Sequence, residues 1–261
     1  MTYDLILLRH GHSEWNAENL FTGWYDCPLN SKGRSEARKV APMLQSARLL
    51  PEVVHTSRLD RAIETAEIVL RDLERSWVDV RRSWRLNERH YGNLTGLNKA
   101  AAKVQYGARQ LQKWRRGYLT PPPPIREDNE FNPNKSPAYR GLPPDLMPRS
   151  ECLADVLDRI LPYWYDSLVP DLKARRKVLV VAHGNSLRAL VKHLDDISDE
   201  DITHLNIGTG IPINYVLDSD MTPLETLPPL ERAVDPAAAK AAAAEVAAQA
   251  DIPTEHQDGG C

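Results

Sequence analysis

The chain runs Leu-Ile-Leu-Leu-Arg-His-Gly over residues 5–11 and repeats this pattern as Val-Leu-Val-Val-Ala-His-Gly over residues 178–184. Each stretch is a short apolar run, typical of a buried strand, that stops at His-Gly. In parallel α/β sheets, ligands bind beyond the carboxyl ends of the strands, close to helix N-termini. We therefore expect His10 and His183 to face one ligand, and two unrelated loop histidines are the alternative.

Helical and extended segments alternate around these two runs. Apolar residues at three- and four-residue steps predict helices at residues 31–47, 57–73, 98–106, 108–116, 150–164 and 186–194, and short apolar runs predict further strands at residues 53–54, 78–84 and 211–217. Ser31 and Ser57 are candidate N-caps, and Ser150 is expected to start its helix. Strands that alternate with helices favour a three-layer α/β fold with a mainly parallel central sheet.

Two segments depart from this alternation. Residues 120–149 are crowded with proline, charge and Asn, and such long loops are commonly functional or disordered. We expect residues 93–149 to be a helical and proline-rich insertion in a single catalytic domain that spans residues 1–232. An alanine-rich tail follows at residues 233–261, in which Asp235 can cap a marginal helix that begins at Pro236. We expect residues 233–250 of this tail to form a mobile lid and the last residues, 252–261, to be unstructured.

Composition narrows the classes of function. The 261 residues are 42% hydrophobic and 26% charged, and the formal net charge is -3. A negative balance argues against a nucleic-acid partner held by bulk charge. The apolar runs are too short to span a membrane, and the first strand follows the N-terminus without a basic leader. Three cysteines without metal spacing, Cys27, Cys152 and Cys261, favour a reduced cytoplasmic setting.

The residues beside His10 indicate phosphoryl chemistry. A nucleophilic imidazole must be neutral, and the adjacent Arg9 guanidinium disfavours its charged form while supplying donors for phosphate. Phosphoryl transfer needs positive charge around three oxygens, which Arg9, Arg61 and a protonated His183 can provide. Carboxylates and cysteines at ligand spacing are missing from the two His-Gly stops, so no metal site is expected there. The site reads as a phosphoryl acceptor.

Several motifs carry a resemblance to a known family. They are Leu-Arg-His-Gly-His-Ser-Glu-Trp-Asn, Phe-Thr-Gly-Trp-Tyr-Asp, Thr-Ser-Arg-Leu-Asp-Arg-Ala, Leu-Asn-Glu-Arg-His-Tyr-Gly, Gly-Leu-Asn-Lys, Trp-Arg-Arg-Gly and Ala-His-Gly-Asn-Ser-Leu-Arg-Ala. In this order, from residue 5 to about residue 217, the chain resembles the 2,3-bisphosphoglycerate-dependent phosphoglycerate mutases of the histidine phosphatase superfamily. Arg-His-Gly alone indicates only the superfamily. The combination of Leu-Asn-Glu-Arg-His-Tyr-Gly with Trp-Arg-Arg-Gly is much more specific to the mutases.

The resemblance implies a role for each matching residue. His10 would be the phosphohistidine, Glu88 the proton donor and acceptor, and His183 a stabiliser of the transferring phosphoryl group. The residues implied to surround that phosphoryl are Arg9, Ser13, Asn16, Thr22, Gly23, Arg61, Gly184 and Asn185. The residues implied to bind the rest of the substrate, its carboxylate and second phosphate included, are Arg89, Tyr91, Lys99, Arg115 and Arg116.

The implied reaction interconverts 3-phosphoglycerate and 2-phosphoglycerate, with 2,3-bisphosphoglycerate as primer and intermediate and no metal. A substrate hydroxyl must lose a proton as it takes phosphate from His10, and one carboxyl group such as Glu88 can take that proton and later return it. The resemblance also implies a homodimer or homotetramer. His12 stands where the family usually has Glu or Gln, Cys27 where a small aliphatic residue is expected, and the likeness weakens after Asp218.

Three other functions are open on the residues alone. A phosphohydrolase on the same scaffold would discharge His10 to water, and it would have little use for Lys99, Arg115 and Arg116. An inactive phosphate-binding module is disfavoured because the nucleophile, the second histidine and the carboxylate occur together. A metal-dependent mutase is disfavoured because its serine nucleophile and ligand clusters are not apparent.

Overall fold

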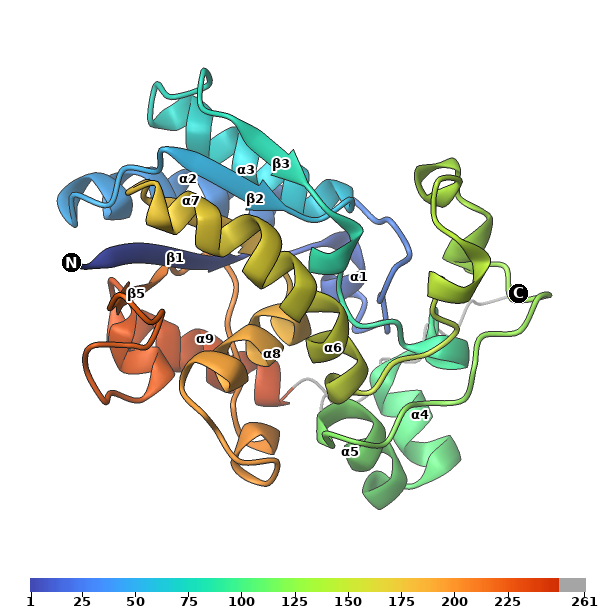
Figure 1. The fold of residues 1–261 in the computed structure, drawn as a ribbon. Helices are drawn as coiled ribbons and strands as arrows, with labels where there is room; N and C mark the ends of the chain where they lie inside the picture. Colours follow the sequence, from blue (N-terminus) through green and yellow to red (C-terminus); the bar gives the residue numbers. More distant parts are fainter. Residues whose placement is uncertain (249–261) are drawn as a thin grey trace.

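The computed structural model describes residues 1–248; the tail prediction for residues 252–261 lies outside them. A five-stranded sheet in the order β3-β2-β4-β1-β5 forms the centre of the molecule (Figure 1). Its strands are β1 (Tyr3–Arg9), β2 (Val53–Thr56), β3 (Val80–Arg82), β4 (Val178–Ala182) and β5 (Ile213–Leu217). All neighbouring pairs are parallel except β1 and β5, so the expectation of a mainly parallel sheet is confirmed.

The two His-Gly stretches become neighbours in the middle of this sheet. β1 pairs with β4 in a register that sets Arg9 opposite Ala182. The backbone N–H of His10 then donates to the carbonyl oxygen of Ala182 at 3.0 Å. Both strands therefore end at the same level, and the sheet itself brings His10 and His183 to one edge.

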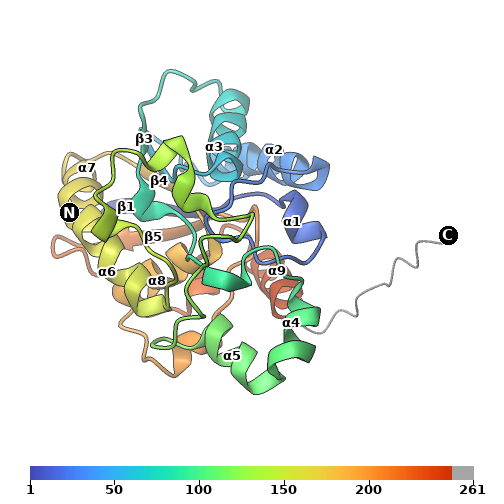
Figure 2. The same ribbon diagram turned by 90° about the vertical axis from the view of Figure 1, so that its right-hand side faces the viewer.

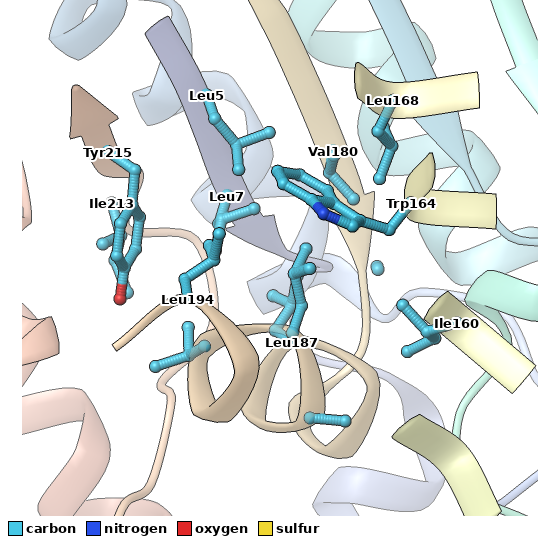
Figure 3. Packing of buried hydrophobic residues seen from close by; sticks show 14 of the residues in the cluster. Leu5, Leu7, Ile160, Trp164, Leu168, Val180, Leu187, Leu194, Ile213 and Tyr215 are labelled. Carbon is cyan, nitrogen blue, oxygen red and sulfur yellow. The ribbon is translucent and has the colours of Figure 1, made fainter. Parts of the chain in front are cut away.

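Alternate side chains of β1 pack into two separate apolar layers, because successive side chains of a strand point to opposite faces of the sheet. Leu5 and Leu7 pack with Trp164 and Leu187 on one face of the sheet (Figure 3). Ile6 and Leu8 pack on the other face with apolar residues of the helices at residues 31–46 and 60–72. Figures 1 and 2 show the helices on both sides of the sheet, which is the predicted three-layer fold.

The helices of the two outer layers are α1 (Glu14–Ala17), α2 (Ser31–Ser46), α3 (Asp60–Asp72), α6 (Leu153–Tyr163), a π-helical turn (Trp164–Leu168), α7 (Val169–Lys173) and α8 (Gly184–Leu194). Among them, α2 starts at the predicted residue, α3, α6 and α8 start two or three residues from it, and α1 and α7 were not predicted. Asn30, not Ser31, caps α2, because its side-chain oxygen accepts from the Gly33 N–H at 2.9 Å. The predicted strand at 78–84 shortens to β3, and Ser150 lies before its helix, which Cys152 precedes.

Ser57 does not cap α3 as expected from the sequence. The helix begins at Asp60, after Leu59, and Leu59 makes no side-chain capping bond. The Ser57 hydroxyl instead accepts from the Leu59 N–H and pairs with His183. The residue that looked like a helix cap thus belongs to the surroundings of the second histidine.

The insertion lies to one side of the sheet, on the right in Figure 1. It contains α4 (Lys99–Tyr106) and α5 (Ala108–Arg116), as predicted, followed by the proline-rich segment with only short 3-10 turns. The 3-10 turns of the chain are Trp84–Leu86, Gly92–Leu94, Pro133–Lys135, Pro137–Tyr139, Pro144–Leu146, Asp201–Thr203 and Pro229–Arg232. Because proline lacks an N–H donor, the many prolines of this segment disfavour a continuous helix or a strand of the sheet.

The alanine-rich tail forms α9 (Pro236–Ala248). Asp235 accepts from the Ala238 N–H at 2.9 Å, which confirms the predicted cap. Ala239 and Ala243 are buried, so this helix is docked on the domain along one face. Within residues 1–248, none of the helices combines the length and the apolar character that a membrane crossing requires.

Candidate active site

A pocket opens beyond the carboxyl ends of β1 and β4, where the sequence predicts a ligand. It is lined by side chains from the strand ends, the α4–α5 hairpin, α8 and α9. These residues are Arg9, His10, Asn16, Leu20, Thr22, Gly23, Arg61, Glu88, Tyr91, Lys99, Arg115, Arg116, Gly184, Asn185, Arg188, Ile207 and Val246. Thirteen of the sixteen predicted site residues are among them; Ser13, Arg89 and His183 are the exceptions.

His10 is held as a neutral nucleophile. Its Nδ1 lies 2.7 Å from the carbonyl oxygen of Gly11, and because a carbonyl only accepts, Nδ1 carries the hydrogen. The lone pair of a neutral ring is then on Nε2. Burial, followed by the charges of Arg61 and Arg9, holds the pKa of His10 well below its usual value. The ring therefore offers Nε2 as an unprotonated nucleophile at neutral pH.

His183 lies against His10 with its ring centroid 4.9 Å away and the ring planes at 61°. Its Nε2 lies 2.8 Å from the Ser57 hydroxyl oxygen, and the buried Nδ1 has no hydrogen-bond partner among the described residues. Burial and the charge of Arg61 lower the pKa of His183 well below its usual value. These surroundings favour a neutral ring, in place of the protonated ring that the sequence suggested.

Two guanidinium groups flank the histidines. Arg61 is 1% exposed and donates to the carbonyl oxygens of Gly23 at 2.8 Å and Tyr25 at 3.1 Å. Gly23 has φ +57°, a left-handed backbone that glycine adopts without strain. Arg9 donates to Ile207 O at 2.6 Å, while its buried Nε has no partner within residues 1–248. Backbone carbonyls thus hold both cations toward the pocket.

Ser13 lies next to the pocket but does not line it. Its hydroxyl accepts from the Asn16 N–H at 3.2 Å, and Asn16 Oδ1 accepts from the Ser13 N–H at 3.1 Å, which caps the short helix α1. Asn16 and Thr22 do reach the pocket. Ser13 thus holds Asn16 in place, and its role beside the phosphoryl group stays a prediction.

Glu88 enters the pocket from the loop after the Trp84–Leu86 turn. Its Oε1 accepts from the Arg89 N–H at 2.7 Å, from the Asn185 N–H at 3.2 Å and from Asn185 Nδ2 at 2.9 Å. The side chain is 8% exposed. A buried carboxyl with three donors has a fixed orientation, so it can exchange a proton with a group bound in one place.

Arg89 lies behind the pocket wall. Its Nη2 donates to Arg115 O at 2.6 Å, and its guanidinium carbon lies 4.9 Å from the centre of the Tyr91 ring. Burial alone would raise the pKa of the Tyr91 hydroxyl, but the charges of Arg89 and Arg115 outweigh it and lower that pKa. Arg89 therefore supports Tyr91 and Arg115, which both line the pocket.

The far side of the pocket is a wall of cations from the insertion. Lys99 begins α4, and Arg115 and Arg116 end α5. Burial, followed by the charges of Arg115 and Arg9, lowers the pKa of Lys99 to about 7. Burial and the nearby Arg188 also lower the pKa of Arg116. Three crowded cations form a side of the pocket that a multiply charged anion would stabilise.

The sequence reasoning missed several residues of the site. Ser57 was read as a helix cap, and Val246 was not singled out within the predicted lid. Arg188 was quoted inside the Ala-His-Gly motif without a role. Its place three residues after Asn185 on one helix face is the signal that could have found it. No group of three or more His, Cys, Asp or Glu side chains in the described part of the chain is arranged to hold a metal ion.

The arrangement can accept and return a phosphoryl group. A neutral imidazole nitrogen stands beside two cations, and a fixed carboxyl lies across the same pocket. Preorganised cations of this kind stabilise the charge on a transferring phosphoryl group. The wall from the insertion adds a second place for negative charge, away from His10.

Comparison with known proteins agrees with this chemistry. The profile of the histidine phosphatase superfamily (branch 1) matches residues 5–132 and 125–220. A 2,3-bisphosphoglycerate-dependent phosphoglycerate mutase of Streptomyces avermitilis is 58% identical over 240 residues, which cover 92% of this chain and 94% of that protein. One from Thermobifida fusca is 60% identical over 222 residues, 85% of this chain and 90% of that protein.

Solved structures share the fold at lower identity. Mycobacterial hydrolase 1 has a TM-score of 0.66 at 24% identity, over 85% of this chain and 95% of the other. A mycobacterial glucosyl-3-phosphoglycerate phosphatase in complex with VO3 has a TM-score of 0.63 at 26% identity, over 82% and 92%. The predicted fold class is confirmed. The chain belongs to the histidine phosphatase superfamily and, within it, to the 2,3-bisphosphoglycerate-dependent phosphoglycerate mutases.

Proposed function

We propose that this chain interconverts 3-phosphoglycerate and 2-phosphoglycerate in glycolysis and gluconeogenesis, as an isomerase primed by 2,3-bisphosphoglycerate. The observation that carries the proposal is the joint placement of a neutral His10, a fixed Glu88 and the cations of the insertion in one pocket. A phosphoryl acceptor, a proton carrier and a second anion site are the three parts that a transfer within one small phosphorylated acid requires.

His10 and Glu88 share the chemical steps. Nε2 of His10 attacks the phosphorus of a bound phosphate ester, so the N–P bond forms as the P–O bond breaks. Glu88 gives its proton to the leaving alkoxide oxygen. In the return step the carboxylate takes a proton from a glycerate hydroxyl, and that oxygen attacks phosphorus while the N–P bond breaks. Arg9 and Arg61 stabilise the charge of the moving phosphoryl group, and the ring of His183 lies beside His10, 4.9 Å from it between ring centroids.

The residues fit the implied primer. 2,3-Bisphosphoglycerate carries two phosphates and a carboxylate, and Lys99, Arg115 and Arg116 give the pocket the matching positive charge away from His10. Two guanidinium atoms buried nearby, Arg9 Nε and Arg89 Nη1, have no hydrogen-bond partner among residues 1–248. When bound, the primer supplies the phosphoryl group that loads His10. Lys99, Arg115 and Arg116 would hold its carboxylate and its second phosphate.

Labelled 2,3-bisphosphoglycerate tests the proposal. We expect acid-labile, base-stable label on His10 together with turnover of 3-phosphoglycerate and almost no release of free phosphate. Label on another residue would count heavily against the mechanism. Rapid release of phosphate with the primer present would instead favour the phosphohydrolase on the same scaffold.

We also propose that α9 is a lid over the pocket, as the sequence suggested for residues 233–250. Val246 lines the active-site pocket, and Ala247 shares a second hollow with Lys103 and Arg115 of the insertion. A docked lid would exclude water and protect the phosphohistidine from hydrolysis. Deletion of residues 233–261 should raise phosphatase activity relative to mutase activity. An unchanged ratio would contradict the lid proposal.

The remaining proposals concern assembly and location. We propose a cytoplasmic homodimer or homotetramer. β3 is an edge strand, and Trp77 just before it is 71% exposed, so this side of the sheet offers unpaired backbone and apolar surface for a second copy. Sedimentation at micromolar concentration should give a dimer or tetramer, and a single species of monomer mass would overturn the assembly proposal.

A further inference from the structure

Arg188 lies on the pocket wall but has no part in the steps described above. It is 1% exposed and lies on α8, three residues after Asn185. Its Nη1 donates to Asn185 Oδ1 at 2.8 Å, and its Nη2 donates to the carbonyl oxygen of Ile202 at 2.5 Å. The guanidinium is therefore fixed by backbone on one side and holds a side-chain amide on the other.

This contact decides which way the Asn185 amide points. A guanidinium has only donors, so the amide atom that faces Arg188 must be the oxygen. The amide nitrogen then faces the opposite side, where it donates to Glu88 Oε1 at 2.9 Å and to the Tyr91 hydroxyl at 3.0 Å. The reversed amide would set its oxygen against the carboxylate and its N–H groups against the guanidinium.

We infer that Arg188 is a positioning residue for Glu88: by fixing the Asn185 amide, it holds the carboxyl where the substrate proton is exchanged. The inference rests on the proposed function, in which Glu88 carries that proton. Asn185 supplies two of the three donors to Glu88, and the third is the Arg89 N–H. Without Arg188 the Asn185 amide oxygen loses this partner, and the side-chain donor to Glu88 is held less firmly.

Arg188 also lines the pocket, so a direct contact with substrate is the rival role. The two roles differ in what they act on. A positioning residue for Glu88 matters when the leaving oxygen needs a proton. A substrate contact matters for any ligand that reaches the far wall, whether Glu88 works or not.

Two phosphoryl donors test whether the effect of Arg188 depends on a leaving group that needs a proton, and a double-mutant cycle with Glu88→Gln then separates positioning from substrate contact. Loading of His10 from 2,3-bisphosphoglycerate expels an alkoxide, which needs the proton of Glu88, whereas p-nitrophenyl phosphate expels a stable nitrophenolate. In single-turnover experiments we expect Arg188→Met to slow loading from 2,3-bisphosphoglycerate by about tenfold, a part of the roughly 10²–10⁴-fold that a positioned acid contributes. Loading from p-nitrophenyl phosphate should change by less than about twofold, and Arg188→Lys should recover part of the loss.

A double-mutant cycle with Glu88→Gln completes the test. If Arg188 acts through Glu88, Arg188→Met adds nothing to the loss in Glu88→Gln. An additive loss, or an equal loss with both donors, would overturn the inference and leave the proposed function intact. If Glu88→Gln alone loads His10 from 2,3-bisphosphoglycerate at the wild-type rate, the proposed role of Glu88 fails instead. Should Arg188→Met not fold, Arg188→Lys on the same two donors decides the question.

Discussion

The two sides of the pocket are built from different parts of the chain. The strand end, which comprises Arg9, His10, Arg61 and His183, lies at the sheet, where β1 and β4 pair residue by residue. The insertion wall, which comprises Lys99, Arg115 and Arg116, comes from two helices outside the sheet. The strand end is set by backbone hydrogen bonds, and the insertion wall by the packing of a helical hairpin.

Burial beside cations has opposite consequences on the two sides. At the strand end it removes the charge of His10 and so produces a nucleophile. On the insertion wall it lowers the pKa of Lys99 and Arg116, which makes positive charge costly until an anion arrives. Burial beside cations, which lowers pKa values on both sides, thus prepares both the attacking imidazole and the site for the far end of the substrate. The predictions below test whether the two sides can be separated.

Loss of the nucleophile should have the largest effect. His10→Gln keeps a side chain of similar size but has no lone-pair nitrogen, so mutase turnover should fall by about 10⁴-fold or more. Coupled assays of 2-phosphoglycerate formation measure this. His12→Gln is the matched control, because His12 bonds Asn30 outside the lining of the pocket and should retain most activity. Comparable losses in the two variants would contradict the assignment.

Substitutions on the insertion wall should reduce activity on 3-phosphoglycerate much more than loading from p-nitrophenyl phosphate. Lys99→Met and Arg116→Met each remove a charged contact, worth about 1.5–3 kcal/mol, so kcat/KM for 3-phosphoglycerate should fall by roughly 10- to 100-fold. Loading of His10 from p-nitrophenyl phosphate should fall much less, because this ester has no second anionic group. Equal losses with both substrates would show that the wall supports the strand end instead of binding the far end.

The pH dependence of binding should identify Lys99. With its pKa at about 7, Lys99 is charged below that pH and loses its charge as the pH rises through it. Affinity for 3-phosphoglycerate should therefore decline above pH 7, by at most about tenfold per pH unit. Titrations in the His10→Gln background avoid turnover. The His10→Gln/Lys99→Met double variant should lack the decline, and an identical pH profile would exclude Lys99 as its source.

The smallest effect concerns the lid that covers both sides. A Cβ added at Gly208 would lie 2.2 Å from Ala242 Cβ, so Gly208→Ala should push α9 away from the pocket. The ratio of phosphatase to mutase activity should then rise by about threefold or more, because water gains access to the phosphohistidine. Gly141→Ala, which meets nothing within 4 Å, is the matched control. A similar ratio in both variants would argue against closure by α9.

The strand end could be predicted from the sequence because it depends on local pattern. Two apolar runs that stop at His-Gly predict neighbouring parallel strands, and these place His10 and His183 together. The protonation of His183 could not be predicted, because it depends on burial and on Arg61, which come from tertiary structure.

The insertion wall could be located only through family resemblance. An Arg-Arg pair at a helix end is usually solvated, and nothing in its local pattern shows that Arg115 and Arg116 face a pocket. Arg188 and Ser57 were missed because they act on residues far away in the sequence: Arg188 supports the pair formed by Asn185 and Glu88, which are 97 residues apart. Ser57 pairs with His183, which is 126 residues away.

The central claim is that His10 is neutral and attacks through Nε2. Histidine enriched in ¹⁵N and long-range ¹⁵N–³¹P coupling can locate the phosphorus on the ring of the phosphorylated protein. Because Nδ1 donates to the Gly11 carbonyl, the account predicts phosphorus on Nε2 of His10. Phosphorus on Nδ1 of His10, or on the ring of His183, would contradict it.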